Sequence, residues 1–149
     1  MTLPLFRDDG WLPKGHHSAA WDEVILRLSG LPNSRRADIM ASLLRWRDAA
    51  HTENLTGLIV LNGSFVSSKE TPNDFDLVFS YDAATETLIR SKATARALTD
   101  YQVCRTLGFL GDIFALPASL GLSSPAFSGL DMFDFDRQGT PKGVIEVQR

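Results

Sequence analysis

The chain has 149 residues, of which 44% are hydrophobic and 22% are charged, and its formal net charge is −3. This composition is typical of a globular protein, predicts a single domain over residues 1–149 and excludes an intrinsically disordered chain. The negative charge excludes a general basic surface for nucleic acid, and the lone cysteine excludes an internal disulfide or a zinc–cysteine cluster and favours the reducing cytoplasm.

The first twenty residues contain several prolines and glycines, so no long element is expected there. A short strand over Leu3–Phe6 and a turn at Asp8–Gly10 are predicted. No apolar run is long enough for a signal peptide or a membrane span, so no membrane partner is expected. His16 and His17 are adjacent, but neighbouring side chains diverge in strands and in helices, so we expect structural or exposed histidines rather than two ligands of one metal.

Two helices are predicted between residues 19 and 51. Apolar residues recur at helical spacing from residue 19 to 28, and Gly30 ends that helix. The second helix begins near Asn33 or Ser34 and runs to about His51. Its expected buried side is formed by Ile39, Leu43, Leu44 and Trp46. Its arginines, which form either a basic stripe or, as we expect, a solvated face, are Arg35, Arg36, Arg45 and Arg47.

The central stretch, residues 58–80, predicts a buried strand ending at Asn62, a tight Gly63-Ser64 turn, a polar excursion and a second strand that opens on Asp74 and Asp76. Alternating strand residues project to the same side, which places these two carboxylates about 6–7 Å apart. At about 6 Å and an effective dielectric near 20, they repel by about 3 kcal/mol. Either a cation lies between them, or one is protonated, or this end of the strand is open to water.

This stretch also has the chemistry of a phosphate and metal site. Magnesium takes carboxylate oxygens and readily shares its coordination with substrate phosphates. The Gly63-Ser64 turn offers backbone N–H groups and a hydroxyl to an anion. The sequence therefore predicts a metal site and a phosphate site side by side.

The second half of the chain predicts a helix within residues 83–98, a helical segment over Asp100–Leu107 and a strand over Gly111–Leu116. Cys104 is expected to be a small buried hydrophobe, because no neighbouring base would activate a nucleophilic thiol. Asp112 opens its strand as Asp74 does, and it is either a third member of the acidic group or a simple acidic residue at a strand end.

A terminal hairpin is predicted from residues 132–136 and 143–147. It contains a second Asp-Phe-Asp, with Asp134 and Asp136. Because no Gly-Ser turn precedes this tripeptide, we interpret it as a half-exposed strand with its aspartates toward water.

The Gly63-Ser64 pair, followed after nine residues by Asp74-Phe75-Asp76, resembles the signature of the nucleotidyltransferase superfamily of the DNA polymerase beta type. In that signature a Gly-Ser pair closes one strand, an Asp-x-Asp lies on the next, and a third acidic residue lies on a later strand, which Asp112 matches by order. Residues 63–77 and 135–147 also resemble a group of small, largely uncharacterised bacterial proteins of this fold. The resemblance implies an α+β nucleotidyltransferase fold, with a small mixed β-sheet flanked by helices.

The resemblance also implies roles for the matching residues. Asp74 and Asp76 would hold one or two Mg²⁺ ions, and Asp112 would act with them in activating the acceptor. Gly63 and Ser64 would contact the β- and γ-phosphates of a nucleoside triphosphate such as ATP. Lys69, between the two motifs, would add a positive charge toward these phosphates or lie exposed to solvent.

The implied reaction is the transfer of a nucleoside monophosphate to a hydroxyl of a protein or RNA acceptor, with release of pyrophosphate. No additional domain for the acceptor is expected, so a partner protein, a second copy of the chain or the substrate itself would supply that surface. The chain is similar in this to the small nucleotidyltransferase-type proteins of bacterial toxin–antitoxin and defence modules. The alternative is a catalytically silent domain of the same fold that binds a nucleotide or a partner protein.

Overall fold

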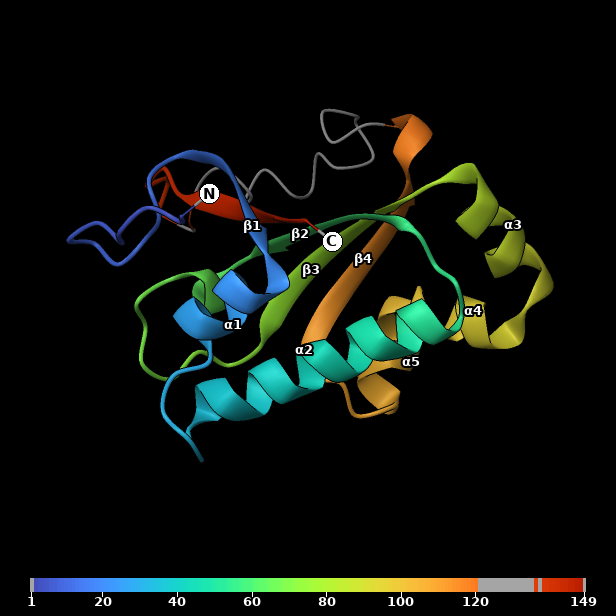
Figure 1. Cartoon of the computed structure of the whole chain (residues 1–149), viewed down its shortest axis with the longest axis horizontal. Coiled ribbons are helices and arrows are strands. Elements are labelled where there is room, and N and C mark those ends of the chain that lie inside the picture. Colours follow the sequence, from blue (N-terminus) through green and yellow to red (C-terminus); the bar gives the residue numbers. More distant parts are fainter. Residues whose placement is uncertain (1, 121–135, 137, 149) are drawn as a thin grey trace.

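The structure is a computed structural model that describes residues 2–120, 136 and 138–148. A five-stranded sheet has the strand order β1-β5-β2-β3-β4, with helices packed around it (Figure 1). The strands are β1 (Gly15–Ala20), β2 (Gly57–Asn62), β3 (Phe75–Tyr81), β4 (Gly111–Pro117) and β5 (Gly143–Gln148). The helices are α1 (Trp21–Leu28), α2 (Arg35–Thr52), α3 (Ala83–Ser91), α4 (Ala93–Leu98) and α5 (Tyr101–Thr106), with two short 3-10 helices, η1 (Ser64–Val66) and η2 (Ala118–Leu120).

The sheet is mixed. β1 runs parallel to β5 and β3 runs parallel to β4, whereas β2 is antiparallel to both of its neighbours, β5 and β3. The last strand of the chain therefore lies inside the sheet, between β1 and β2. This arrangement confirms the expected α+β class with a mixed sheet flanked by helices.

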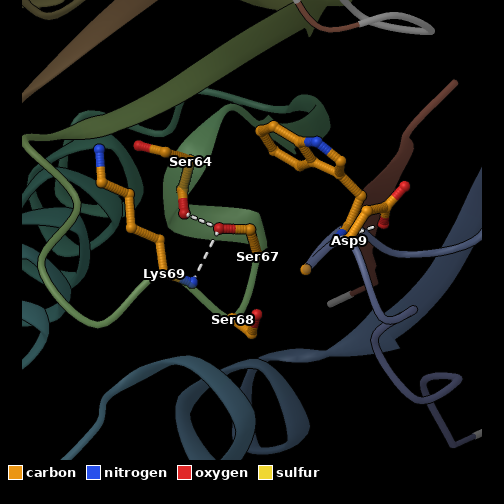
Figure 2. A pocket seen from close by; sticks show the side chains of 7 residues that line it. Asp9, Ser64, Ser67, Ser68 and Lys69 are labelled. Atoms are coloured by element: carbon orange, nitrogen blue, oxygen red, sulfur yellow. Dashed lines mark hydrogen bonds between the residues drawn. The ribbon is translucent and has the colours of Figure 1, made fainter. Parts of the chain in front are cut away.

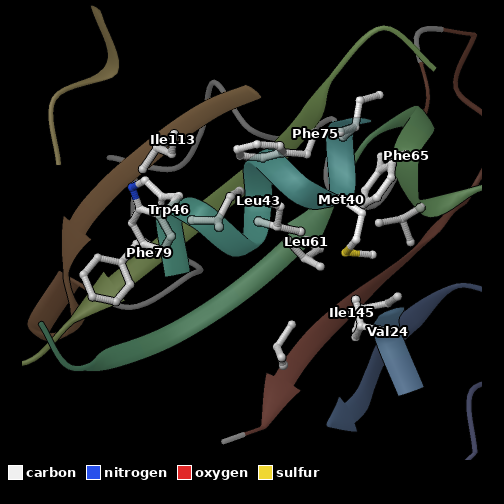
Figure 3. Close-up of a cluster of buried hydrophobic side chains, with 14 of the residues drawn as sticks. Val24, Met40, Leu43, Trp46, Leu61, Phe65, Phe75, Phe79, Ile113 and Ile145 are labelled. Atoms are coloured by element: carbon white, nitrogen blue, oxygen red, sulfur yellow. The ribbon is translucent and has the colours of Figure 1, made fainter. Parts of the chain in front are cut away.

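The main hydrophobic core lies between one face of the sheet and the helices, chiefly α1 and α2 (Figure 3). Trp46 of α2 is fully buried, its ring meets Phe79 edge-on with centroids 5.5 Å apart, and its Nε1 donates to the carbonyl oxygen of Leu98 at 3.0 Å. Strand side chains alternate between faces, so Phe75, Leu77 and Phe79 of β3 all point into this core.

A second, smaller cluster of Val60, Val78 and Val144 lies on the opposite face of the sheet. The same alternation along β3 places Asp76 on this second face with Val78, between the core-facing Phe75 and Leu77. The acidic residue is thus held on a rigid strand without entering the main core.

Most of the predicted elements are present. The second helix begins where expected, because the Ser34 side chain accepts a hydrogen bond from the Ala37 backbone N–H at 3.1 Å and so caps α2. The strands around the Gly-Ser turn, the strand that opens with Asp112 and the short helix containing buried Cys104 are also confirmed. Burial raises the pKa of the Cys104 thiol to about 11, in agreement with a packing role.

The strand predicted over Leu3–Phe6 is wrong. The backbone of this segment bonds to side chains of α1 instead of a neighbouring strand: Leu3 N–H donates to the Glu23 carboxylate, and Arg27 donates to the carbonyl oxygens of Leu3 and Pro4, both at 2.9 Å. The turn at residues 8–10 is present, with Gly10 N–H donating to the Arg7 carbonyl oxygen at 2.9 Å.

Two other predictions are corrected in part. The range 83–98 contains two helices rather than one, separated at Lys92, whose backbone is extended (φ −122°, ψ 124°). Residues 143–147 do form a strand, β5, but its neighbours are β1 and β2, so it is not an arm of a simple hairpin. Residues 132–135, proposed as the other arm, lie outside the described residues.

His16 and His17 lie on β1 and have separate partners. His16 Nδ1 is 2.7 Å from Glu146 Oε1, and His17 Nε2 is 2.7 Å from the Pro13 carbonyl oxygen, so the two rings serve different local contacts, as expected. In the part of the chain that the structure describes, no helix is both long and apolar enough to cross a membrane.

Candidate functional site

Three polar side chains form a row across the ends of three neighbouring strands. Asp76 on β3 is the register partner of Asn62 on β2 and of Asp112 on β4. Register partners project to the same face, so Asn62, Asp76 and Asp112 all lie on the face opposite the main core. The structure therefore brings Asp112, which is remote in sequence, directly beside the Asp-x-Asp motif.

Asp74 lies immediately before β3 and is linked to Asp112 through Arg105 of α5. The Arg105 Nη2 atom is 2.7 Å from Asp74 Oδ2 and 2.6 Å from Asp112 Oδ1, and its Nε donates to Asp112 Oδ1 at 2.7 Å. One guanidinium thus compensates two of the three carboxylates. Sequence reasoning missed Arg105, since no local pattern connects it with either aspartate.

Asp76 forms no such ion pair with any of the residues that the structure describes. Burial raises its pKa to about 7, and repulsion by Asp74 and Asp112 adds to this shift, while Lys142 and Arg105 act in the opposite direction. The protonated form of this group is therefore favoured well above the usual pH range of an aspartate. A carboxyl group poised in this way can gain or lose a proton, or bind a cation, at little cost.

Gly63 connects the acidic row to the Gly-Ser turn. Its φ is +80°, a conformation that favours glycine, and a Cβ atom built on it would clash with the Asp76 carboxylate. The Asp76 side chain therefore packs directly against the Gly63 backbone. The two sequence motifs, separated by nine residues, form one continuous surface.

Two further buried polar groups lie near Asp76 and were not singled out from the sequence. The Asn62 side-chain oxygen is buried and has no hydrogen-bond partner among the described residues. Lys142 is only 5% exposed, burial lowers the pKa of its ammonium group, and its charge acts on Asp76. Asn62 could have been noticed as a polar residue closing an apolar strand just before Gly63, but nothing local points to Lys142.

The loop after the Gly-Ser turn is fixed by Arg36, which corrects the expectation that this arginine lies on a solvated face. Arg36 is 8% exposed. Its guanidinium donates to the carbonyl oxygens of Leu28, Phe65, Ser67 and Lys69, at 3.2, 2.9, 2.5 and 2.8 Å respectively. Arg36 thus bonds the end of α1 to the segment that follows Ser64.

A pocket of about 310 Å³ lies beside this loop (Figure 2). Ser64, Ser67, Ser68 and Lys69 line one side, and the N-terminal residues Asp9, Gly10 and Trp11 complete the lining. Figure 2 shows the Lys69 side chain extending beside Ser64. Sequence-predicted Ser64 and Lys69 are therefore neighbours, although the Lys69 side chain as a whole is exposed.

The second Asp-Phe-Asp has a different setting. Asp136 accepts hydrogen bonds from the backbone N–H groups of Gln138 and Thr140 at 2.9 and 2.8 Å and from Trp11 Nε1 at 3.2 Å. These bonds lower its pKa, with the Thr140 N–H contributing most. The bonding agrees with a structural interpretation of Asp136, while Asp134 lies outside the described residues.

The donor atoms around Asp76 fit a hard divalent cation in their chemistry. Asp112 is the register partner of Asp76, the charges of Asp74 and Asp112 both act on Asp76, and the Asn62 oxygen, which has no hydrogen-bond partner among the described residues, lies in the same row. In the conformation of the structure, however, Arg105 bridges Asp74 and Asp112, and no three His, Cys, Asp or Glu residues within the described ranges are grouped so as to hold a metal. Binding of a cation by all three carboxylates would require Arg105 to give up part of its contacts.

Fold and site together define an α+β domain that carries an acidic cluster at the strand ends of a mixed sheet, next to a glycine-dependent turn. The chain belongs to the family described as "Family of unknown function (DUF6932)", whose model matches residues 4–148. No curated protein and no solved structure gives a significant match to the chain.

Proposed function

We propose that this protein is a magnesium-dependent nucleotidyltransferase that moves a nucleoside monophosphate from a nucleoside triphosphate to a hydroxyl of a protein or RNA acceptor. The observation that carries the proposal is that Asp76 packs against Gly63 of the Gly-Ser turn and is the register partner of Asp112, which Arg105 joins to Asp74. The strand arrangement supports it, since the Gly-Ser pair follows β2, the Asp-x-Asp opens β3 and the third aspartate lies on β4. This is the order of motifs in the nucleotidyltransferase signature, and it favours the nucleotidyltransferase fold.

In the proposed reaction, the oxygen of the acceptor hydroxyl forms a bond to the α-phosphorus while the bond from that phosphorus to the bridging oxygen breaks. Pyrophosphate leaves with the electron pair, and the hydroxyl proton passes to a carboxylate of the acidic cluster. Asp74, Asp76 and Asp112 would hold Mg²⁺, which when bound supplies charge neutralisation at the reacting phosphates. Such chemistry depends on positioning and charge and needs no protein nucleophile.

The remaining groups have roles that follow from their positions. Ser64 can donate a hydroxyl hydrogen bond to a phosphate oxygen, and Lys69 provides a positive charge on the same side of the pocket. Gly63 allows the chain to approach the Asp76 carboxylate closely. Asp112, the register partner of Asp76 on the neighbouring strand, would act in activation of the acceptor hydroxyl.

A second candidate function is a catalytically silent domain that binds a nucleotide or a partner protein. The observation that favours it is the bridge from Arg105 to Asp74 and Asp112, which already compensates the two outer carboxylates. If this bridge persisted with nucleotide bound, the acidic cluster would serve binding without transfer.

The proposal is tested by incubating the purified full-length chain with each α-labelled nucleoside triphosphate, Mg²⁺ and cell extract. We expect label to appear in a protein or RNA, and the Asp74→Ala and Asp76→Ala variants to lose it while retaining a cooperative thermal transition. The matched control is Asp48→Ala, whose carboxylate is 68% exposed and pairs with Arg47 on α2.

The outcomes separate the two candidates. Unchanged transfer in both the Asp74→Ala and Asp76→Ala variants would exclude the mechanism. Calorimetric binding of a triphosphate with no transfer to any acceptor would favour the silent domain. Absence of both binding and transfer would contradict both functions.

A further inference from the structure

The pocket beside Ser64 combines one aromatic side chain with a polar wall. Among the seven described residues that line it, Trp11 is the only aromatic one, and the others are three serines, an aspartate, a lysine and a glycine. A volume of about 310 Å³ is at the lower end of the range for small-molecule sites, which suits one flat ring system with its sugar. An aromatic platform with hydrogen-bonding groups around it is the general means by which proteins hold a nucleobase.

Trp11 is held in place from several directions. Its backbone N–H donates to Asp9 Oδ1 at 3.1 Å, its carbonyl oxygen accepts from the Arg7 N–H at 2.7 Å, and its indole Nε1 donates to Asp136 at 3.2 Å. A backbone bridge also joins Trp11 to Ser67 across the pocket wall. Trp11 as a whole is nevertheless only partly buried, and it lines the pocket.

The pocket is connected to the acidic cluster by two routes. Through the chain, Ser64 lines the pocket while its neighbour Gly63 packs against Asp76. Through space, the Lys142 ammonium lies 5.1 Å from the centre of the Trp11 ring, and its charge acts on Asp76. A ligand on Trp11 would therefore lie next to the groups to which the triphosphate is assigned.

We propose that this pocket binds the nucleoside end of the triphosphate, with the base stacked on the indole of Trp11. The inference rests on the proposed function and adds the residue that holds the base. Stacking tolerates any of the four bases, because each has a π-face. The N-terminal segment 9–11, which lies outside the Gly-Ser and Asp-x-Asp motifs, thereby becomes part of the substrate site.

The test uses tryptophan emission of the full-length chain, excited at wavelengths that nucleotides do not absorb. Trp46 is fully buried and Trp21 lies under the Arg47 guanidinium, 5.1 Å from its ring centre, so neither lines the pocket. ATP, GTP, CTP and UTP are titrated in parallel with inorganic tripolyphosphate, with calorimetry on the same samples. We expect bound nucleotide to quench the emission and tripolyphosphate to leave it unchanged.

Variants assign the signal to one residue. Trp21→Phe should keep the nucleotide-dependent quenching, and Trp11→Phe should abolish it while keeping an aromatic face for the base. Trp11→Ala should weaken nucleotide binding by about 10-fold or more without altering tripolyphosphate binding. If the alanine variant fails to fold, the comparison of wild type with Trp11→Phe still decides the assignment.

Three results would overturn the inference. One is calorimetric binding of a nucleotide with unchanged Trp11 emission, and a second is equal quenching by nucleotide and tripolyphosphate. A third is an equal loss of affinity for both ligands in Trp11→Ala, which would mean that Trp11 only anchors the N-terminal loop. In each of these three cases the protein still binds nucleotide, so the proposed function stands. If the protein bound no nucleotide at all, both the assignment of the base to Trp11 and the proposed function would be excluded.

Discussion

Asp76 on β3 and Asp112 on β4 are register partners in a parallel pair of strands, so their carboxyl groups lie side by side on one face of the sheet. Adjacent strands are about 4.8 Å apart, and at such a separation two carboxylates cannot both ionise freely. Arg105 compensates Asp112 together with Asp74, whereas burial, with repulsion by Asp74 and Asp112 added to it, raises the pKa of Asp76 to about 7.

Replacement of Asp76 by asparagine should therefore change the pH dependence of stability. The pKa of Asp76 is raised from 3.8 to about 7 on folding, so protonation of this group stabilises the folded state below about pH 4, and this contribution is lost as the pH rises to about 7. Asp76→Asn should be as stable as wild type near pH 4 and more stable near pH 8, by at most about 4 kcal/mol. Urea unfolding at the two pH values measures the difference.

The effect of Mg²⁺ on stability provides a second measurement of the charge on Asp76. Near pH 8, where Asp76 is ionised, Mg²⁺ should raise the unfolding midpoint of wild type by binding the folded state only. Asp76→Asn should show a smaller response. Equal stability of the two proteins at both pH values, with equal responses to Mg²⁺, would refute the electrostatic account of this site.

Arg105 should compete with a divalent cation for Asp74 and Asp112. Its side chain is 40% exposed, so its removal should lower the free energy of unfolding by about 1 kcal/mol or less. In Arg105→Gln, Asp74 and Asp112 lose the guanidinium that bridges them, and calorimetry with MgCl₂ alone should show several-fold tighter binding than in wild type.

The matched control for this change is Arg90→Gln on α3. Arg90 also pairs with a carboxylate, Glu86, at 3.1 Å, but it contacts none of the three aspartates. It should leave magnesium binding unchanged. Weaker or equal binding in Arg105→Gln would mean that the guanidinium supports the cation site or has no influence on it.

Most of the helices and strands of this protein could be predicted from local sequence patterns, whereas its long-range contacts could not. The period of apolar residues and a Ser34 cap were enough to predict α2, and the Gly-Ser turn between two apolar runs was enough to predict β2 and β3. The same pattern placed Asp74, Asp76 and Asp112 at strand ends, because strand ends are marked by local polarity.

What the sequence did not predict are the contacts that depend on packing. Arg105 reaches the aspartates only because β4 pairs with β3 and thereby positions α5 over the strand ends. Burial of Arg36 could not be read from a helical pattern, since its partners are carbonyl oxygens at the end of α1 and in residues 65–69, which are 8 to 33 residues away in the chain. Trp11 and Lys142 meet through segments that lie at opposite ends of the chain.

Arg36 should be essential for the loop that carries Ser64. Its replacement by methionine leaves four carbonyl oxygens without their buried donor, so Arg36→Met should lower the free energy of unfolding by about 3 kcal/mol or more. Hydrogen exchange over residues 64–69 should accelerate. Arg35→Met is the control, because exposed Arg35 makes one bond, to the Asn73 carbonyl oxygen, and should change stability by less than about 0.5 kcal/mol. Equal effects of the two substitutions would contradict the role assigned to Arg36.

Gly63 should be required for its close approach to Asp76 as well as for its backbone conformation. Gly63 has φ +80° and ψ −170°, a conformation open essentially to glycine alone, where another residue costs about 1–3 kcal/mol, and an alanine Cβ at this position would also displace the Asp76 carboxylate. Gly139 is the control for a positive φ, because its φ is +79° and no atom of the described residues lies within 4 Å of its Cβ position. We therefore expect Gly63→Ala to lower the unfolding free energy by at least about 1 kcal/mol more than Gly139→Ala, and to lose nucleotide transfer while Gly139→Ala retains it. Equal losses of stability in urea unfolding, with transfer intact in both, would show that the Asp76 carboxylate can move aside and that its position against Gly63 is not needed.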